Sequence, residues 1–272
     1  MIEVVPRASV ANEAAFEGVG LHSGIPVKMW VRPGSGGIQF SLGKERVHAT
    51  LQNVSETARC TCIGPIRTAE HLMSALAALE ITDTEIELST NELPGLDGSA
   101  IEFYSLLLSA GREKLPDREV NIPYKRIYLQ EGDVSIAISS GTGRWRFEYQ
   151  TGDRWPKSQI FETTSVVDDY LGQIAAARTF ALEEELEGIA KAGLGKGLDQ
   201  ESALIIGEKD YINSPRFLDE PVRHKLLDLI GDFYLSGIPI RKLNVSAIRS
   251  GHRTNVQAAK LLAEYAKVEQ PV

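Results

Sequence analysis

The chain has 272 residues, of which 43% are hydrophobic and 24% charged, and its formal net charge is −8. This composition is typical of a soluble globular protein, and the length suits one large domain or two small ones. The acidic charge excludes a general nucleic-acid binder, which needs a basic surface. No apolar run is long enough to predict a membrane-spanning helix, and no signal peptide is recognised, so we expect a cytoplasmic protein.

The only two cysteines, Cys60 and Cys62, are separated by one residue. Side chains alternate in direction along a strand, so this spacing does not favour a disulfide between them. A reducing compartment fits this cysteine usage. We interpret both as buried strand residues. A two-cysteine zinc clip is the alternative, and the absence of a second pair argues against it.

The first half of the chain shows a strand–helix–strand–helix pattern. The predicted elements are antiparallel strands over 14–40, a helix over 68–80, a strand over 83–89 and a helix over 99–110. Thr68 is a candidate cap for the first helix, and Ser99 for the second. Gly111 is expected to end the second helix.

The second half repeats this order. The predicted elements are several strands over 124–150, helices over 182–192 and 221–235, a strand over 243–249 and a helix over 254–267. A polar stretch over 112–119 predicts the boundary between domains of residues 1–117 and 118–272. The repeat predicts an α+β protein of two similar domains, each a β-sheet layer with helices.

Two residues of the predicted helix over 221–235 are candidate metal ligands. His224 and Asp228 lie four positions apart, so their side chains project from one side of the helix. Together with His71 they would supply two imidazoles and a carboxylate, which can hold zinc on three sides and leave the fourth for water. Asp232 continues the stripe and could orient another side chain. The alternative is a solvated helix face with ordinary side-chain pairing.

Two further residues are candidate proton carriers. Glu70 directly precedes His71 and could take a proton from a metal-bound water, although it could also simply favour the start of a helix. His252 follows a Ser-Gly pair and could stabilise an oxyanion or protonate a departing amine, or it could face solvent on a loop. We interpret His22 and His48 as structural residues.

A series of motifs resembles the UDP-3-O-acyl-N-acetylglucosamine deacetylase family, zinc enzymes of lipid A biosynthesis. The motifs are FEGVGLHSG (16–24), CTC (60–62), TAEHLMSAL (68–76), NELPGLDGSA (91–100), ARTF (177–180), GLGKG (193–197), EPVRHKLLDLIGD (220–232) and SGH (250–252). They run through nearly the whole chain and are highly specific in combination.

The resemblance implies two α+β domains whose helical layers pack face to face, with the active site between them. The implied zinc ligands are His71, His224 and Asp228, a set that also accepts Fe(II). The implied catalytic residues are Glu70 as general base, His252 as acid, Thr179 as oxyanion donor and Asp232 as the residue that orients His252. The implied reaction is hydrolysis of the N-acetyl group, which releases acetate and a free amine.

The resemblance also implies an acylated nucleotide sugar as the substrate. Lys225 would meet its phosphates, Phe180 would border the sugar, and Leu198 and Ser202 belong to a segment near the sugar and nucleotide. An insert near 151–175 would form an apolar passage for the fatty acyl chain. That chain would also provide peripheral contact with a membrane.

The sequence departs from the family pattern near the expected substrate. Leu198 and Asp199 stand where the family usually has Gly-Ser, and Asp199 would repel a diphosphate. Ser202 stands where Asn is usual, and the stretch around Trp155 is polar for an acyl passage. These departures leave open a paralogue that acts on another N-acetylated substrate, and also a non-catalytic metal-binding relative. The oligomeric state is left open.

Overall fold

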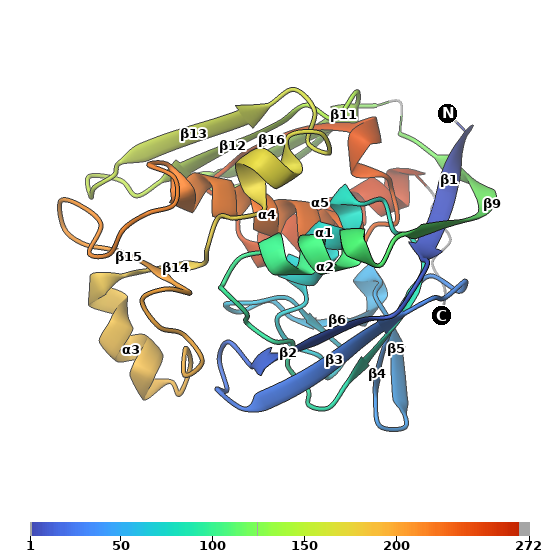
Figure 1. The fold of residues 1–272 in the computed structure, drawn as a ribbon. Helices are drawn as coiled ribbons and strands as arrows, with labels where there is room; N and C mark the ends of the chain where they lie inside the picture. Colours follow the sequence, from blue (N-terminus) through green and yellow to red (C-terminus); the bar gives the residue numbers. More distant parts are fainter. Residues whose placement is uncertain (1, 124, 267–272) are drawn as a thin grey trace.

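The computed structural model of the protein describes residues 2–123 and 125–266. Two five-stranded sheets lie on the outside, with the four main helices α1, α2, α4 and α5 between them (Figure 1). The chain therefore forms two similar α+β domains, as the repeated sequence pattern predicts. In this part of the chain no helix is long and apolar enough to cross a membrane.

The N-terminal sheet has the strand order β2-β3-β8-β4-β5. Its strands are β2 (Ala14–Val19), β3 (Pro26–Arg32), β4 (Ile38–Leu42), β5 (Glu45–His48) and β8 (Thr84–Leu88). Helix α1 (Glu70–Ala78) precedes β8 and α2 (Ile101–Ser109) follows it. β8 pairs in parallel with β4 because the chain returns through α1. The strands of 14–40 were expected to be antiparallel. That holds for β2 with β3, but β4 takes β8 as a parallel neighbour.

The C-terminal sheet repeats this arrangement with the order β10-β11-β16-β12-β13. Its strands are β10 (Ile127–Glu131), β11 (Val134–Ser140), β12 (Trp145–Gln150), β13 (Ser158–Thr163) and β16 (Leu243–Ile248). Helix α4 (Glu220–Tyr234) precedes β16 and α5 (His252–Ala266) follows it. β16 pairs in parallel with β12, as β8 does with β4. The repeat inferred from the sequence is therefore a repeat of topology.

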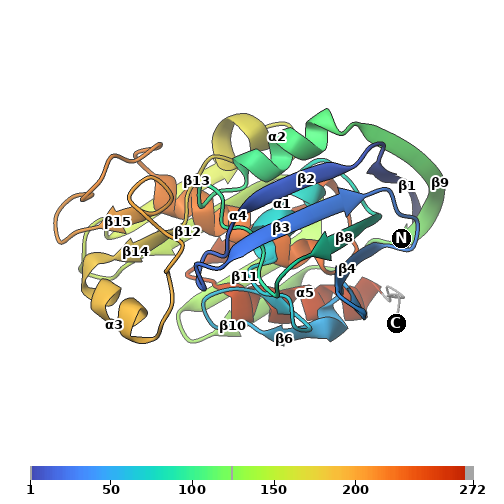
Figure 2. The ribbon, with the colours of Figure 1, turned by 60° about the horizontal axis from the view of Figure 1, so that its bottom comes forward.

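The remaining elements connect or extend these two units. They are β1 (Ile2–Val10), η1 (Leu51–Asn53), β6 (Val54–Glu56), β7 (Cys62–Ile63), β9 (Arg112–Asn121), η2 (Tyr170–Ile174), β14 (Phe180–Leu182), η3 (Glu183–Glu185), α3 (Leu186–Lys191), β15 (Leu204–Ile206) and η4 (Ile240–Lys242). The polar stretch over 112–119 lies in β9, which pairs antiparallel with β1. Figures 1 and 2 show β14, α3 and β15 projecting from the main body.

Several helix ends differ from the sequence expectation. Thr68 does not cap α1, because its φ of 62° is left-handed and its hydroxyl donates to Glu92 Oε1 at 3.3 Å. Ser99 Oγ does accept the backbone N–H of Ile101 at the start of α2. The helix expected over 182–192 is divided into η3 and α3. The last helix begins earlier than expected, at His252, and position 267 lies outside the described residues.

The two domains meet where α1 packs against α4. Every residue of α1 is buried. Gly231 of α4 lies directly against the backbone of Glu70, and a Cβ built on Gly231 would sit 2.1 Å from the Glu70 carbonyl oxygen. No real side chain fits at that distance, so only glycine permits this crossing. The crossing sets how closely side chains from the two domains approach each other.

We expect Gly231→Ala to force α1 away from α4 and to destabilise the fold by about 1–3 kcal/mol, the usual cost of overpacking. Urea unfolding followed by circular dichroism measures this change. Gly188→Ala is the matched control, because Gly188 is also helical and its added Cβ would have no heavy atom within 4 Å. Equal unfolding midpoints for Gly231→Ala and the parent protein would show that a side chain at position 231 fits between α1 and α4, which contradicts this prediction.

Candidate active site

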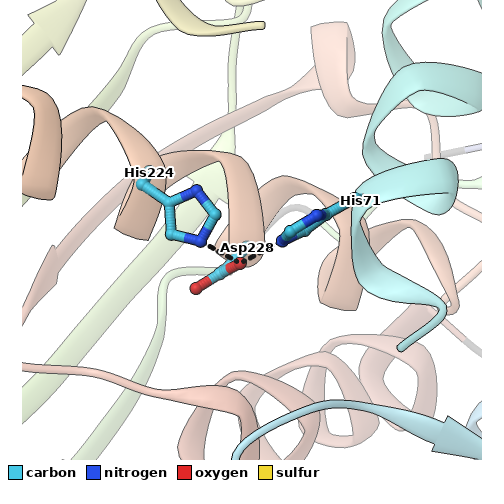
Figure 3. Close-up of side chains that lie close together, drawn as sticks. All are labelled: His71, His224 and Asp228. Atoms are coloured by element: carbon cyan, nitrogen blue, oxygen red, sulfur yellow. Dashed lines mark ion pairs between the residues drawn. The ribbon is translucent and has the colours of Figure 1, made fainter. Parts of the chain in front are cut away.

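The α1–α4 crossing brings three potential metal ligands together (Figure 3). His71 Nε2 lies 3.7 Å from Asp228 Oδ1, and His224 Nε2 lies 3.5 Å from the same oxygen. One ligand atom from each residue lies within 4.8 Å of the other two, and all three side chains are buried. In a tetrahedral zinc site with bonds of about 2.0–2.1 Å, neighbouring ligand atoms are roughly 3.4 Å apart. The three side chains can therefore share one metal ion.

The chemistry of these atoms also fits a metal ion. Asp228 Oδ1 is buried and has no hydrogen-bond partner within the described ranges. His224 Nδ1 lies 3.0 Å from the carbonyl oxygen of Ala177, an arrangement in which Nδ1 donates and leaves the Nε2 lone pair facing Asp228. Burial is the main cause that lowers the pKa of His71 to about 3, and the nearby His224 lowers it further. The His71 imidazole is therefore neutral. Neutral imidazoles and an unsatisfied carboxylate oxygen are the donors that a divalent ion requires.

Glu70, the first residue of α1, lies beside this cluster. Its Oε2 accepts the backbone N–H of Thr61 at 2.9 Å, and its Oε1 lies 4.0 Å from His252 Nε2. Burial raises the pKa of the Glu70 carboxyl well above its usual value. A carboxylate with a raised pKa is a stronger base, which suits a group that takes a proton from water.

His252 begins α5 and faces the same cluster. Its Nδ1 lies 3.0 Å from Asp232 Oδ2, and its Nε2 lies 3.9 Å from Asp228 Oδ2. Burial alone would lower the pKa of His252, but the Asp232 and Asp228 carboxylates outweigh burial and raise it to about 10. His252 is therefore a cation at neutral pH, with Nε2 directed toward the cluster. The structure removes the alternative of a solvent-facing loop histidine.

A cavity of about 540 Å³ opens onto these groups. Its apolar wall includes Leu186, Ile189 and Ala190 around α3, and Leu194 and Leu198 in the loop that follows. The metal-ligand cluster, Glu70, His252 and Thr179 all line the same cavity. The cavity therefore connects the polar cluster with an extended apolar wall.

Similarity to known proteins identifies the family of this chain. The family model of UDP-3-O-acyl N-acetylglycosamine deacetylase matches residues 7–264. The chain belongs to this deacetylase family. Among its relatives, the UDP-3-O-acyl-N-acetylglucosamine deacetylase of Aquifex aeolicus (strain VF5) is 35% identical, and the match covers 96% of this chain and 94% of the relative. The enzymes of the same name from Cellvibrio japonicus (strain Ueda107) and Trichormus variabilis (strain ATCC 29413 / PCC 7937) are 33% and 32% identical. Those matches cover 96% and 93% of this chain, and 91% and 96% of the relatives.

As in the family motif, Thr179 and Phe180 follow a buried arginine. Arg178 Nε donates to Glu220 Oε1 at 2.9 Å, and both side chains are almost fully buried. This pair ties the segment that carries Thr179, just before β14, to the start of α4. As a result the Phe180 ring stands edge-on to His224, with ring centroids 6.1 Å apart. The sequence interpretation missed Arg178 and Glu220, although both lie inside motifs that it quoted.

The expected substrate-binding residues differ in their placement. Lys225, Phe180 and Leu198 line the cavity. Lys225 Nζ donates to Asp228 Oδ2 at 2.9 Å, so it lies against a candidate metal ligand. Ser202 is absent from the cavity lining, and its hydroxyl donates to Asp199 Oδ1 at 2.7 Å.

The apolar wall of the cavity does not include the insert expected near 151–175. No residue from 151–175 lines the described cavity. Its apolar wall is formed by residues of α3 and of the loop after α3. Ile160 of β13 is 53% exposed, whereas Phe161 points into the core beneath the sheet. The apolar wall of this cavity belongs to the β14–α3–β15 projection, and the acyl passage expected near 151–175 stays a prediction. Three consecutive glutamates in η3, directly before α3, concealed the apolar residues of this wall in the sequence.

Two further cavity residues were not foreseen. His22 was interpreted as structural, and it lines the cavity. Arg59 reaches across to the α3 projection, where its Nη2 lies 3.4 Å from Glu185 Oε1. The sequence carried no signal for the Arg59–Glu185 contact, because it joins segments that are distant along the chain.

We expect His71→Ala, His224→Ala and Asp228→Asn each to reduce bound zinc from about one ion per chain to a small fraction, because two protein ligands hold zinc weakly. Elemental analysis after dialysis against a weak chelator measures the content. His48→Ala is the control, since His48 lies at the sheet edge in β5, outside the cluster. Full zinc content in Asp228→Asn would exclude this ligand set.

Proposed function

We propose that the protein hydrolyses the N-acetyl group of UDP-3-O-acyl-N-acetylglucosamine to release acetate and a free amine, a step of lipid A biosynthesis. The family match over residues 7–264 supports this reaction. The observation that carries it is the meeting of the His71, His224 and Asp228 cluster with Glu70 and His252 in one cavity. Metal storage alone would require neither Glu70 nor His252.

We propose zinc as the ion that His71, His224 and Asp228 hold, although the same donors also accept Fe(II). When bound, zinc lowers the pKa of water toward about 7 and polarises a carbonyl group. Three protein ligands leave a coordination position open, which is the pattern of catalytic zinc sites rather than structural ones.

The proton-transfer roles follow from the positions of the remaining side chains. Glu70 takes a proton from the attacking water and so makes it nucleophilic. The cationic His252 stabilises the negative charge that develops on the acetamide oxygen and supplies a proton to the leaving nitrogen. Asp232 holds the His252 ring through Nδ1. The hydroxyl of Thr179 adds a hydrogen bond to the oxyanion. Such donors are each worth about 10² to 10³ in rate.

The substrate contacts are assigned from the cavity lining. We place the sugar beside Phe180 and the fatty acyl chain along the apolar wall that includes Ile189, Leu194 and Leu198. We also propose that Lys225 contacts the substrate phosphates. A metal ion bound to Asp228 would weaken the attraction between the Asp228 carboxylate and the Lys225 ammonium group, which leaves that ammonium group available to a phosphate.

We expect Glu70→Gln to lower kcat by about 10² to 10⁴ without loss of zinc, because it removes a general base and no metal ligand. The assay measures acetate release from UDP-3-O-acyl-N-acetylglucosamine by the zinc-loaded protein. Glu102→Gln is the matched control, because Glu102 occupies the first turn of α2 and lies outside the cavity lining. Near-full activity in Glu70→Gln would refute the assignment of the base.

The same assay tests the substrate. We expect rapid turnover of the acylated nucleotide sugar. For UDP-N-acetylglucosamine we expect kcat/KM to be at least tenfold lower, because it has no acyl chain to contact the apolar wall of the cavity. No turnover of the acylated compound, combined with clear turnover of a different N-acetylated molecule, would overturn the proposed substrate.

We expect Leu194→Asp to raise KM for a long-chain substrate by about tenfold or more, since a buried leucine contact is worth roughly 1.5–3 kcal/mol. Substrates of different acyl length separate this effect from general damage, because the increase is expected to shrink as the chain shortens. Leu218→Asp is the control, as Leu218 is 86% exposed and lies outside the cavity. An unchanged KM in Leu194→Asp would place the acyl chain elsewhere.

A further inference from the structure

We propose that Thr61 is a positioning residue for the deacetylation, holding the general base and the acid–carboxylate pair in one fixed arrangement. The inference rests on the proposed function. Thr61 is the central residue of the CTC motif and is 1% exposed. It does not line the cavity, so it acts through other side chains rather than by touching the substrate.

All three polar groups of Thr61 are bonded to the site or its support. Its backbone N–H donates to Glu70 Oε2 at 2.9 Å, and its hydroxyl donates to Asp232 Oδ1 at 2.5 Å. Its carbonyl oxygen accepts the backbone N–H of Ala69, the residue just before α1, at 3.1 Å. Thr61 is therefore bonded both to the beginning of α1 and to the middle of α4.

The hydroxyl bond fixes the orientation of the Asp232 carboxylate. Oδ1 is held by Thr61, and Oδ2 accepts hydrogen bonds from His252 Nδ1 at 3.0 Å and from Asn255 Nδ2 at 2.9 Å. With Oδ1 held, the carboxylate cannot rotate, and Oδ2 stays aimed at the imidazole. The His252 ring then keeps its Nε2 within 4.0 Å of Glu70 Oε1.

The residues that flank Thr61 restrict its movement. Cys60 and Cys62 are both buried free thiols, and their Sγ atoms lie 3.7 Å apart. Burial on both sides leaves the backbone of Thr61 little freedom, so its N–H and hydroxyl keep constant directions. Residues 60–62 therefore hold the Glu70 and Asp232 carboxylates in a fixed position relative to each other.

Valine at position 61 tests the hydroxyl, because it keeps the shape of threonine and removes the donor. We expect Thr61→Val to lower kcat about tenfold, as expected for loss of a hydrogen bond to a charged group, with KM within about twofold and zinc content unchanged. Thr61→Ser restores the donor and is expected to recover kcat to within about threefold of the parent. If Thr61→Val does not fold, Thr61→Ala removes the same donor.

Thr50→Val is the matched control. Thr50 is also buried, but its hydroxyl has no hydrogen-bond partner in the described ranges, so its removal is expected to leave kcat unchanged. A double-mutant cycle adds a second criterion. If Thr61 acts through Asp232, Thr61→Val causes no further loss of kcat in an Asp232→Asn background, whereas a general structural defect would add to it.

Proton NMR of the zinc-loaded protein supplies a readout that needs no substrate. We expect the His252 Nδ1–H signal, assigned by its loss in His252→Gln, to broaden in Thr61→Val and to remain sharp in Thr50→Val. Absence of turnover by the parent protein would count against the proposed function, and this signal alone would then decide the role of Thr61. The proposal is overturned if the signal is unchanged in Thr61→Val, or if a loss of kcat in Thr61→Val is fully additive with Asp232→Asn.

Discussion

The close approach of α1 and α4 is the constraint on which the rest of the structure depends. Gly231 permits it, because a Cβ at that position would lie 2.1 Å from the Glu70 carbonyl oxygen. Each helix belongs to a different domain and carries ligand atoms that are insufficient alone. At this crossing His71 meets Asp228 and His224, and Glu70 lies near His252. A single interhelical contact thereby brings side chains of the two structural repeats into one cluster.

The electrostatics of the centre favour function over stability. Glu70, Asp228 and Asp232 are all buried, and burying carboxylates is costly unless donors satisfy them. Asp232 is fully satisfied on both oxygens, whereas Asp228 keeps Oδ1 without a donor. The contrast distinguishes the hydrogen-bonded Asp232 from Asp228, whose free oxygen suits the metal-ligand role proposed for it. Residues that hold a site in this way are commonly supported by hydrogen bonds from outside it, as Thr61 illustrates here.

Local sequence patterns predicted the parts of this arrangement that are themselves local. The spacing of His224 and Asp228 within one helix, the repeated order of elements and the family motifs all follow from short stretches of chain. Contacts between distant segments were not predictable in this way, because nothing at Thr61 indicates that Asp232 will lie beside it. Thr68 failed as a cap because its backbone is left-handed, a state set by its surroundings. The part of the cavity wall formed by α3 was not predicted, because its apolar residues follow the three glutamates of η3.

The most direct test of the account is the position of the metal in zinc-loaded crystals, located by anomalous diffraction at the zinc edge. The account predicts one principal peak at the α1–α4 crossing, bonded to His71 Nε2, His224 Nε2 and Asp228 Oδ1 at about 2.0–2.2 Å. A zinc ion bound without His71, or located away from this crossing, would contradict the claim that the two domains assemble a shared metal centre.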